Sequence, residues 1–213
     1  VIIFMMFTSA ASGYAACMAF CRGLSGRKLG NFYRDMVRIT TRILIPVSFI
    51  VGLILVSQGT PQTLMQNFTV ETIEGKYQDF AMGPVAALES IKHLGTNGGG
   101  FMGVNSAHPF EDPNTLANIL ETIAILLIPA ALCFTFGYSV KDMRQGRAIF
   151  AAMLIMLVIF LGTIAVNEQN ATPQLAQNGV VNIAATDTQA GGNMEGKESR
   201  FGIAASSVWT AYT

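Results

Sequence analysis

The chain has 213 residues, of which 51% are hydrophobic and only 12% are charged. Soluble domains carry about 25% charged residues, so this composition is that of a membrane protein. The 13 basic and 13 acidic residues cancel, so net charge gives no sign of a nucleic-acid partner. The three cysteines, Cys17, Cys21 and Cys133, lie in apolar stretches and indicate neither a disulfide framework nor a metal site.

The first part of the chain alternates apolar and polar stretches. Residues 1–21 carry no charge and are long enough to cross a hydrocarbon layer about 30 Å thick. Residues 22–42 hold six basic residues and one acid, so the positive-inside rule predicts that they are cytoplasmic. A second span is predicted at 32–57, with a kink at Pro46. The polar, mostly acidic residues 58–82 then predict an outer loop.

Residues 83–94 predict a short helix that cannot span the membrane. Pro84 suits a first helical turn, and 12 residues at 1.5 Å each give roughly 18 Å of helix. Glu89 and Lys92 are three residues apart, which puts them on one side of this helix. Its C-terminal end is the negative pole of the helix dipole and favours a cation in the stretch that follows.

That stretch, residues 95–110, reads GTNGGGFMGVNSAHPF. The three glycines 98–100 would each cost ~1 kcal/mol inside a helix, but they offer bare backbone. We therefore predict a re-entrant filter loop in which the carbonyl oxygens of 96–99 replace the hydration shell of a monovalent cation. Irregular backbone is tolerated at membrane depth only where it is buried in protein or lines a water-filled cavity. The alternative is a tight turn that serves helix packing.

The rest of the chain repeats the alternation. A span at 113–138 contains Glu121, and residues 139–147 are basic and therefore predicted to be cytoplasmic. A further span at 147–166 leads to a polar outer loop at 167–200. Outside the membrane we thus expect 58–113 and 167–200. Glu121 lies about two turns inside its helix, where a functional role and simple stabilisation by the helix dipole are both open.

Two histidines, His93 and His108, flank the glycine loop. We expect them to position the loop through hydrogen bonds rather than to ligate a metal. The reason is that neither is accompanied by a carboxylate or cysteine at ligand spacing.

The order of basic loop, span, outer loop and short apolar segment occurs twice, which predicts an internal repeat. Residues 25–140 form one complete copy, and residues 141–213 begin another with its own short helix at 201–213. Residues 1–24 are then the last span of a preceding copy. We expect the chain to be an internal piece of a longer protein.

Several motifs resemble a known family. The runs GPVAALESIKHLGTNGGGF and NSAHPFEDP are similar to the second filter region of the potassium-transporting ATPase A chain, the channel-like potassium-binding subunit of the bacterial Kdp complex. Three further stretches of the chain are also similar to this family: RKLGNFYRDMVRITTRILIPVSF, LLIPAALCFTFG and SRFGIAASSVWT. Residues 101–105 depart from it, reading Phe-Met-Gly-Val-Asn where the family more commonly has Phe-Phe-Asn-Ala-Asn.

The resemblance implies an all-α integral membrane protein built from potassium-channel-like repeats of span, pore helix, filter loop and span. It implies K⁺ as the transported ion and the bacterial inner membrane as the location. The implied partners are a P-type ATPase catalytic subunit, to which K⁺ passes, small accessory subunits, and the lipid bilayer. The sequence has no Asp-Lys-Thr-Gly motif and no phosphate loop, so we expect a non-catalytic subunit without a nucleotide.

The residues that match the family's filter stretch, and whose backbone would bind K⁺, are Thr96, Asn97, Gly98, Gly99 and Gly100. The side chains expected to support the filter are Asn105, His108 and Glu89. Two other hypotheses are a secondary transporter with a re-entrant substrate-binding loop, and a structural remnant without an assembled pore. Both copies of the repeat begin from the cytoplasmic side, which favours the channel-like hypothesis over inverted repeats.

Overall fold

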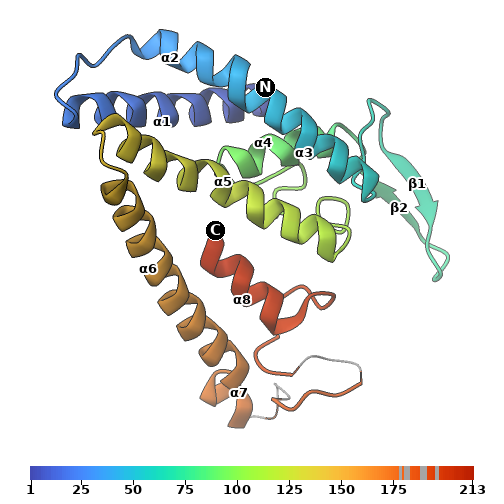
Figure 1. Cartoon of the computed structure of the whole chain (residues 1–213). Helices are drawn as coiled ribbons and strands as arrows, with labels where there is room; N and C mark the ends of the chain where they lie inside the picture. The colour runs from blue at the N-terminus through green and yellow to red at the C-terminus, as the bar shows by residue number, and fades with distance from the viewer. Residues whose placement is uncertain (178, 180–182, 188–190, 195–196) are drawn as a thin grey trace. The chain divides into compact units, whose positions relative to one another are not determined.

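The computed structural model of the chain is mostly helical (Figure 1). It describes residues 1–213 except 178, 180–182, 188–190 and 195–196. Among the described residues, four helical stretches are long and apolar enough to cross a membrane: α1 (Ile2–Leu24), the continuous stretch Phe32–Ser57, α5 (Thr115–Ser139) and α6 (Met143–Asn170). The predicted fold class, an all-α integral membrane protein, is confirmed.

The remaining elements are short: β1 (Phe68–Glu71), β2 (Tyr77–Phe80), α4 (Val85–Leu94), α7 (Pro173–Gln177) and α8 (Gly202–Tyr212). The chain divides into two compact units, residues 1–132 and 133–213, and each is described by itself.

The second long stretch of the first unit consists of α2 (Phe32–Ile39), the π-helical turn η1 (Thr40–Leu44) and α3 (Ile45–Ser57). It begins at Asn31, whose side chain accepts a hydrogen bond from the backbone N–H of Arg34 at 3.0 Å. Pro46 has no N–H to donate to the preceding turn, and the wider η1 turn lies just before it. The kink at Pro46 stays a prediction; the irregularity that the structure shows is the η1 turn before this proline.

An ion pair joins the C-terminal end of α1 to α2. The Arg22 guanidinium pairs with the carboxylate of Asp35, which is buried, and also donates to Leu29 O at 2.9 Å. These bonds fix the loop between the two helices.

The core of the first unit lies between α1, α3, α4 and α5. Ala10 and Ala11 of α1 are buried, and such small residues let helix backbones approach closely. Leu55 of α3 and Ile91 of α4 are fully buried in the same core, and Ala124 contributes from α5. α4 is thus enclosed by longer helices.

The outer loop contains a β-hairpin that the sequence did not predict. β1 and β2 pair antiparallel with Phe68 opposite Phe80, and the two rings stack at 5.5 Å between centroids. Gly75 turns the chain between the strands with a φ of 73°. Both strands have only four residues and are largely exposed: β1 (FTVE) alternates apolar and polar residues, a signal that the sequence analysis did not use, whereas β2 (YQDF) does not.

In the second unit, α6 packs against α8 and meets the end of α5 at two glycines. Asp142 caps α6 by accepting from the backbone N–H of Arg144 at 2.9 Å. α6 runs to Asn170, four residues beyond the predicted span 147–166. The predicted outer loop 167–200 includes α7, and parts of it lie outside the described residues.

Gly146→Ala is expected to destabilise the hairpin of α5 and α6. A Cβ at Gly146 would lie 2.6 Å from Cys133 O and 3.2 Å from the Cα of Gly137, and overpacking of this kind costs about 1–3 kcal/mol. Thermal unfolding of the full-length protein in detergent measures the loss. Gly162→Ala in the same helix is the control, because nothing lies within 4 Å of its Cβ. Equal melting temperatures for the two variants would contradict the close contact.

Candidate functional site

Helix α4 is short, buried and rich in ionisable side chains. All of its residues except Ala87 are buried, including Glu89, Lys92 and His93. A buried charge without a partner costs several kcal/mol, so these side chains need partners inside the protein. The contacts they make determine the shape of the glycine loop that follows.

Both ends of α4 are held by segments distant in sequence. The backbone N–H of Ala86 donates to Pro61 O at 3.0 Å, which satisfies one of the donors that a first helical turn leaves unpaired. At the other end, the hydroxyl of Tyr14 in α1 donates to Leu94 O at 2.5 Å. α4 is therefore fixed at the point where it presents its C-terminus to the loop.

The loop backbone occupies the left-handed region at most positions from 96 to 100. Gly98, Gly99 and Gly100 have φ values of 105°, 82° and 96°, which glycine adopts without the clash that a Cβ would cause. Thr96, with a φ of 52°, adopts this region as a residue with a side chain. Such a conformation costs about 1–3 kcal/mol and persists only where the surroundings enforce it.

The carbonyl oxygens of this loop differ in whether they accept a hydrogen bond from the protein. Among the residues that the structure describes, four of them accept no hydrogen bond: those of Thr96, Asn97, Gly98 and Gly100. Gly99 differs, because its carbonyl accepts from the backbone N–H of Asn105 at 2.6 Å. A carbonyl oxygen without a donor is available to water or to a cation.

Three buried side chains connect α4 to the end of the loop. The ammonium of Lys92 pairs with Glu89 Oε2 and donates to Ser106 Oγ at 2.5 Å. The Ser106 hydroxyl in turn donates to Glu89 Oε2 at 2.8 Å. Ser106 and its neighbour Asn105 both have positive φ, at 70° and 51°. The bonds to Ser106 offset the strain of this turn.

Glu111, which follows the loop in the sequence, binds the loop backbone through its carboxylate. Its Oε1 accepts from the backbone N–H of Met102 at 2.6 Å, and its Oε2 accepts from that of Ser106 at 3.1 Å. The carboxylate is buried, and burial raises the pKa of Glu111 above the usual value of a glutamate. Glu111 thus holds residues 102–106 through their main chain.

Gly100 packs directly against these charged groups. A Cβ at this position would lie 2.6 Å from Glu111 Oε1, 2.7 Å from Glu89 Oε1 and 3.1 Å from Lys92 Nζ. At Gly98 the nearest atom would be Asn105 Oδ1 at 3.9 Å. The two glycines therefore serve differently: Gly98 for its conformation, and Gly100 for conformation and close packing together.

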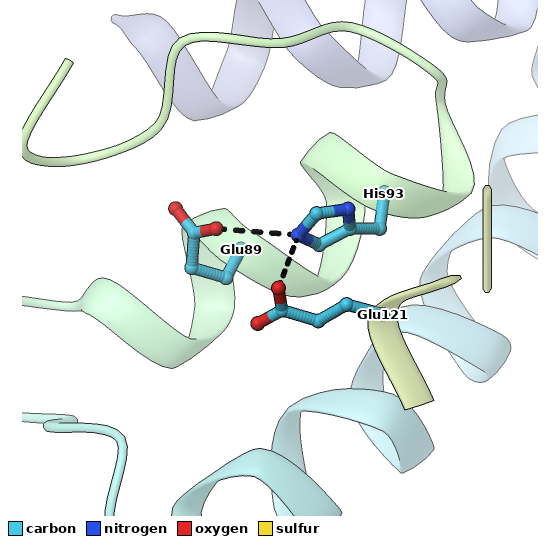
Figure 2. Close-up of side chains that lie close together, drawn as sticks. All are labelled: Glu89, His93 and Glu121. Atoms are coloured by element: carbon cyan, nitrogen blue, oxygen red, sulfur yellow. Dashed lines mark ion pairs between the residues drawn. The ribbon is translucent and has the colours of Figure 1, made fainter. Parts of the chain in front are cut away.

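His93 lies between two carboxylates, Glu89 of its own helix and Glu121 of α5 (Figure 2). Its Nε2 is 3.4 Å from Glu89 Oε2 and 3.0 Å from Glu121 Oε2. The sequence argument that no carboxylate accompanies His93 at ligand spacing was wrong. Glu89 precedes His93 by one helical turn, and only the fold brings Glu121 to the same nitrogen.

Three other residues predicted to belong to the filter or to support it, Asn97, Asn105 and His108, make separate contacts. Asn97 Nδ2 donates to Ser9 Oγ of α1 at 2.7 Å, so it attaches the loop to a neighbouring helix. The backbone of Asn105 bonds to Gly99, as described above. His108 Nδ1 accepts from the backbone N–H of Phe110 at 3.1 Å, and His108 O accepts from the N–H groups of Glu111 and Asp112. The supporting role of these residues stays a prediction.

Sequence reasoning missed Ser106 and Glu111 as parts of the site. A serine after an asparagine and an acid after Pro-Phe are typical of turns and helix starts, so neither carries a local signal. Both act on residues several positions away, through contacts that exist only after folding.

Four membrane-length helices and a buried short helix, followed by a glycine-rich loop of irregular backbone, define an integral membrane protein. The chain matches the family model described as Potassium-transporting ATPase A subunit over residues 1–213, and it belongs to this family.

Relatives in this family are named for potassium. The chain is 52% identical over 219 aligned residues to the potassium-transporting ATPase potassium-binding subunit of Clostridium perfringens, covering 97% of this chain and 38% of that relative. It is 50% identical over 211 residues to the protein of the same name from Geobacillus kaustophilus, covering 98% of this chain and 36% of that relative. The chain thus spans little more than a third of the length of these relatives.

Proposed function

We propose that this chain is part of the potassium-binding and potassium-translocating subunit of an ATP-driven uptake pump. In this proposal the backbone carbonyls of residues 96–100 bind K⁺ in place of its water. The observation that carries the proposal is a run of carbonyl oxygens without protein donors, in a loop of left-handed glycines. Gly99 contributes least to the ligand set, because its carbonyl already accepts the N–H of Asn105.

The electrostatics of α4 support a cation at this position. Its C-terminal end, the negative pole of the helix dipole, leads directly into the loop at Gly95. A cation next to this end is favoured by about 0.3–1 kcal/mol at an exposed site and more in a partly buried one. An anion would be disfavoured by the same field, which argues against an anionic substrate.

The proposal also includes an internal repeat, with residues 25–140 as one copy and residues 141–213 as the beginning of another. In the first unit α3 packs against α4, and in the second α6 packs against α8. Each long helix thus contacts the short helix that follows its polar loop, as expected for two copies of one structural element. The other copies needed to surround a pore would come from the remaining length found in the relatives.

The proposal extends to partners and sidedness. The K⁺ bound here would pass to a P-type ATPase subunit, which hydrolyses ATP and is accompanied by small accessory subunits. Residues 22–42 and 139–147 would be cytoplasmic, and 58–113 and 167–200 would be outside, in a bacterial inner membrane. The names of the relatives and the placement of basic residues support these assignments.

Gly98→Ala in the full-length pump tests the filter assignment. Alanine at a φ of 105° carries strain of about 1–3 kcal/mol, and the loop can relieve it only by turning its carbonyls. We expect the K⁺ concentration that half-activates the ATPase activity of the assembled complex to rise about tenfold or more. The control is Gly75→Ala, which has a φ of 73° and nothing within 4 Å of its Cβ, but lies in the hairpin turn. Unchanged half-activation in a stable Gly98→Ala complex would refute the assignment.

A further inference from the structure

Glu121 is a fully buried acid that the proposed ion-binding loop does not touch. It projects from the apolar helix α5 toward α4, where its Oε2 lies 3.0 Å from His93 Nε2 (Figure 2). Neither of its oxygens makes a hydrogen bond to any described residue, so Oε2 contacts the imidazole as an ion-pair neighbour. An ionisable side chain inside a membrane helix is costly, so its presence calls for a function.

The oxygens around His93 determine where the imidazole carries its proton. Besides Glu121, Nε2 faces Ser106 Oγ at 3.0 Å and Glu89 Oε2 at 3.4 Å. The Ser106 hydroxyl gives its own hydrogen to Glu89, so every oxygen near Nε2 is an acceptor. The network therefore assigns a hydrogen to Nε2.

The Lys92 ammonium argues against a metal in this cluster. The ligand atoms of Glu89, His93 and Glu121 lie within 4.8 Å of one another, as metal ligands do. A metal at their centre would lie beside the Lys92 ammonium, which pairs with the same Glu89 oxygen, and the two positive charges would repel each other. The arrangement orients an imidazole instead.

A continuous line of contacts leads from Glu121 to the loop. His93 contacts Ser106 Oγ, Ser106 follows Asn105 in a turn with two positive φ values, and the N–H of Asn105 holds Gly99 O. An imidazole that turned away would release Ser106 and let this turn relax. The carbonyl directions of the loop would change with it.

We propose that Glu121 is a positioning residue that orients His93 and thereby sets the ion selectivity of the loop. This inference rests on the proposed function, because the loop must bind the transported ion for its shape to matter. Discrimination among monovalent cations depends on the number and placement of carbonyl oxygens. A change in loop shape alters the ratio of K⁺ to Na⁺ affinity more than it alters the maximal rate.

The test uses two substitutions at Glu121 in the full-length complex. Glu121→Gln keeps the shape of the side chain and a polar oxygen beside His93 Nε2, whereas Glu121→Leu removes that oxygen. We expect the ratio of half-activating Na⁺ to half-activating K⁺ to fall about tenfold in Glu121→Leu and to stay within twofold in Glu121→Gln. The maximal ATPase rate of both variants should stay within about threefold of the parent.

Ser106→Ala should lower the same ratio, because it removes the next contact in the line. Ser90→Ala is the control: Ser90 is a buried hydroxyl of the same helix whose oxygen donates only to Ala87 O of its own turn. If Glu121→Leu does not assemble, Glu121→Met replaces it, because it also removes the oxygen but keeps the length of the side chain. An unchanged ratio in Ser106→Ala, or a loss in Glu121→Gln equal to that of Ser106→Ala, overturns the inference.

The failure of this inference can be told from the failure of the proposed function. If Gly98→Ala raises half-activating K⁺ but neither Glu121→Leu nor Ser106→Ala changes the ion ratio, only the positioning role is wrong. If Gly98→Ala has no effect either, the loop is not the ion-binding site.

Discussion

Gly100→Ala is expected to destabilise the glycine loop more than the same change at either neighbouring glycine. Alanine in the left-handed region costs about 1–2 kcal/mol from backbone strain. Its Cβ would also lie 2.6 Å from Glu111 Oε1 and 2.7 Å from Glu89 Oε1, and overpacking adds about 1–3 kcal/mol. We expect a total loss of about 2–5 kcal/mol, seen as a lower melting temperature of the purified full-length complex.

Gly99→Ala separates the cost of backbone strain from the cost of overpacking. Gly99 has a similar φ of 82°, but nothing lies within 4 Å of its added Cβ. It should therefore show the backbone strain alone and melt at a higher temperature than Gly100→Ala. Equal losses in the two variants would mean that Glu89 and Glu111 do not pack against the loop. Glu111→Asp shortens one of the two acids and should recover part of the stability in combination with Gly100→Ala.

The helices could be predicted because their signals are local. Apolar runs with few charges indicated the four long helices, and Pro84 followed by a short apolar segment indicated α4, which begins at Val85. The glycine run at 98–100 indicated left-handed backbone, and all three residues have positive φ. In each case the property depends on residues close together in the sequence.

The contacts around the loop could not be predicted in the same way. Ser106 joins Lys92 and Glu89 only because the loop turns back onto α4, and that turn depends on two non-glycine residues with positive φ. Glu121 reaches His93 only through the packing of α5 against α4. The pairing of His93 with Glu89 was different, since a spacing of four residues in a helix is visible in the sequence.

Most of the contacts around the loop are made by buried charged side chains. The acids Glu89, Glu111 and Glu121 are buried around one lysine and one histidine. Polar networks of this kind stabilise a single conformation when every member is paired and destabilise the fold when a partner is lost. Lys92 is the residue whose loss leaves the most charge without compensation, because it is the sole lysine among the buried residues described.

Lys92→Met is therefore expected to destabilise the protein by about 3–5 kcal/mol, the usual cost of removing one partner of a buried ion pair. Methionine keeps the length and volume of the side chain, but Glu89 and Ser106 lose the ammonium. Lys76→Met is the matched control, because Lys76 pairs with Glu74 at 3.9 Å with both side chains 80% exposed. Exposed pairs contribute about 0–1 kcal/mol, so the control should melt close to the parent.

A second substitution shows whether the loss comes from the uncompensated acid. Glu89→Gln removes the buried charge while it keeps the shape, so the double variant Lys92→Met with Glu89→Gln should be more stable than Lys92→Met alone. Thermal unfolding of the four proteins gives the coupling free energy directly, as the deviation from additivity. Strict additivity would mean that Lys92 stabilises the loop by packing rather than by pairing with Glu89. We expect a deviation of about 1 kcal/mol or more, within the range of about 0.5–3 kcal/mol found for residues in contact, and this would assign the stability of the loop to the ion pair.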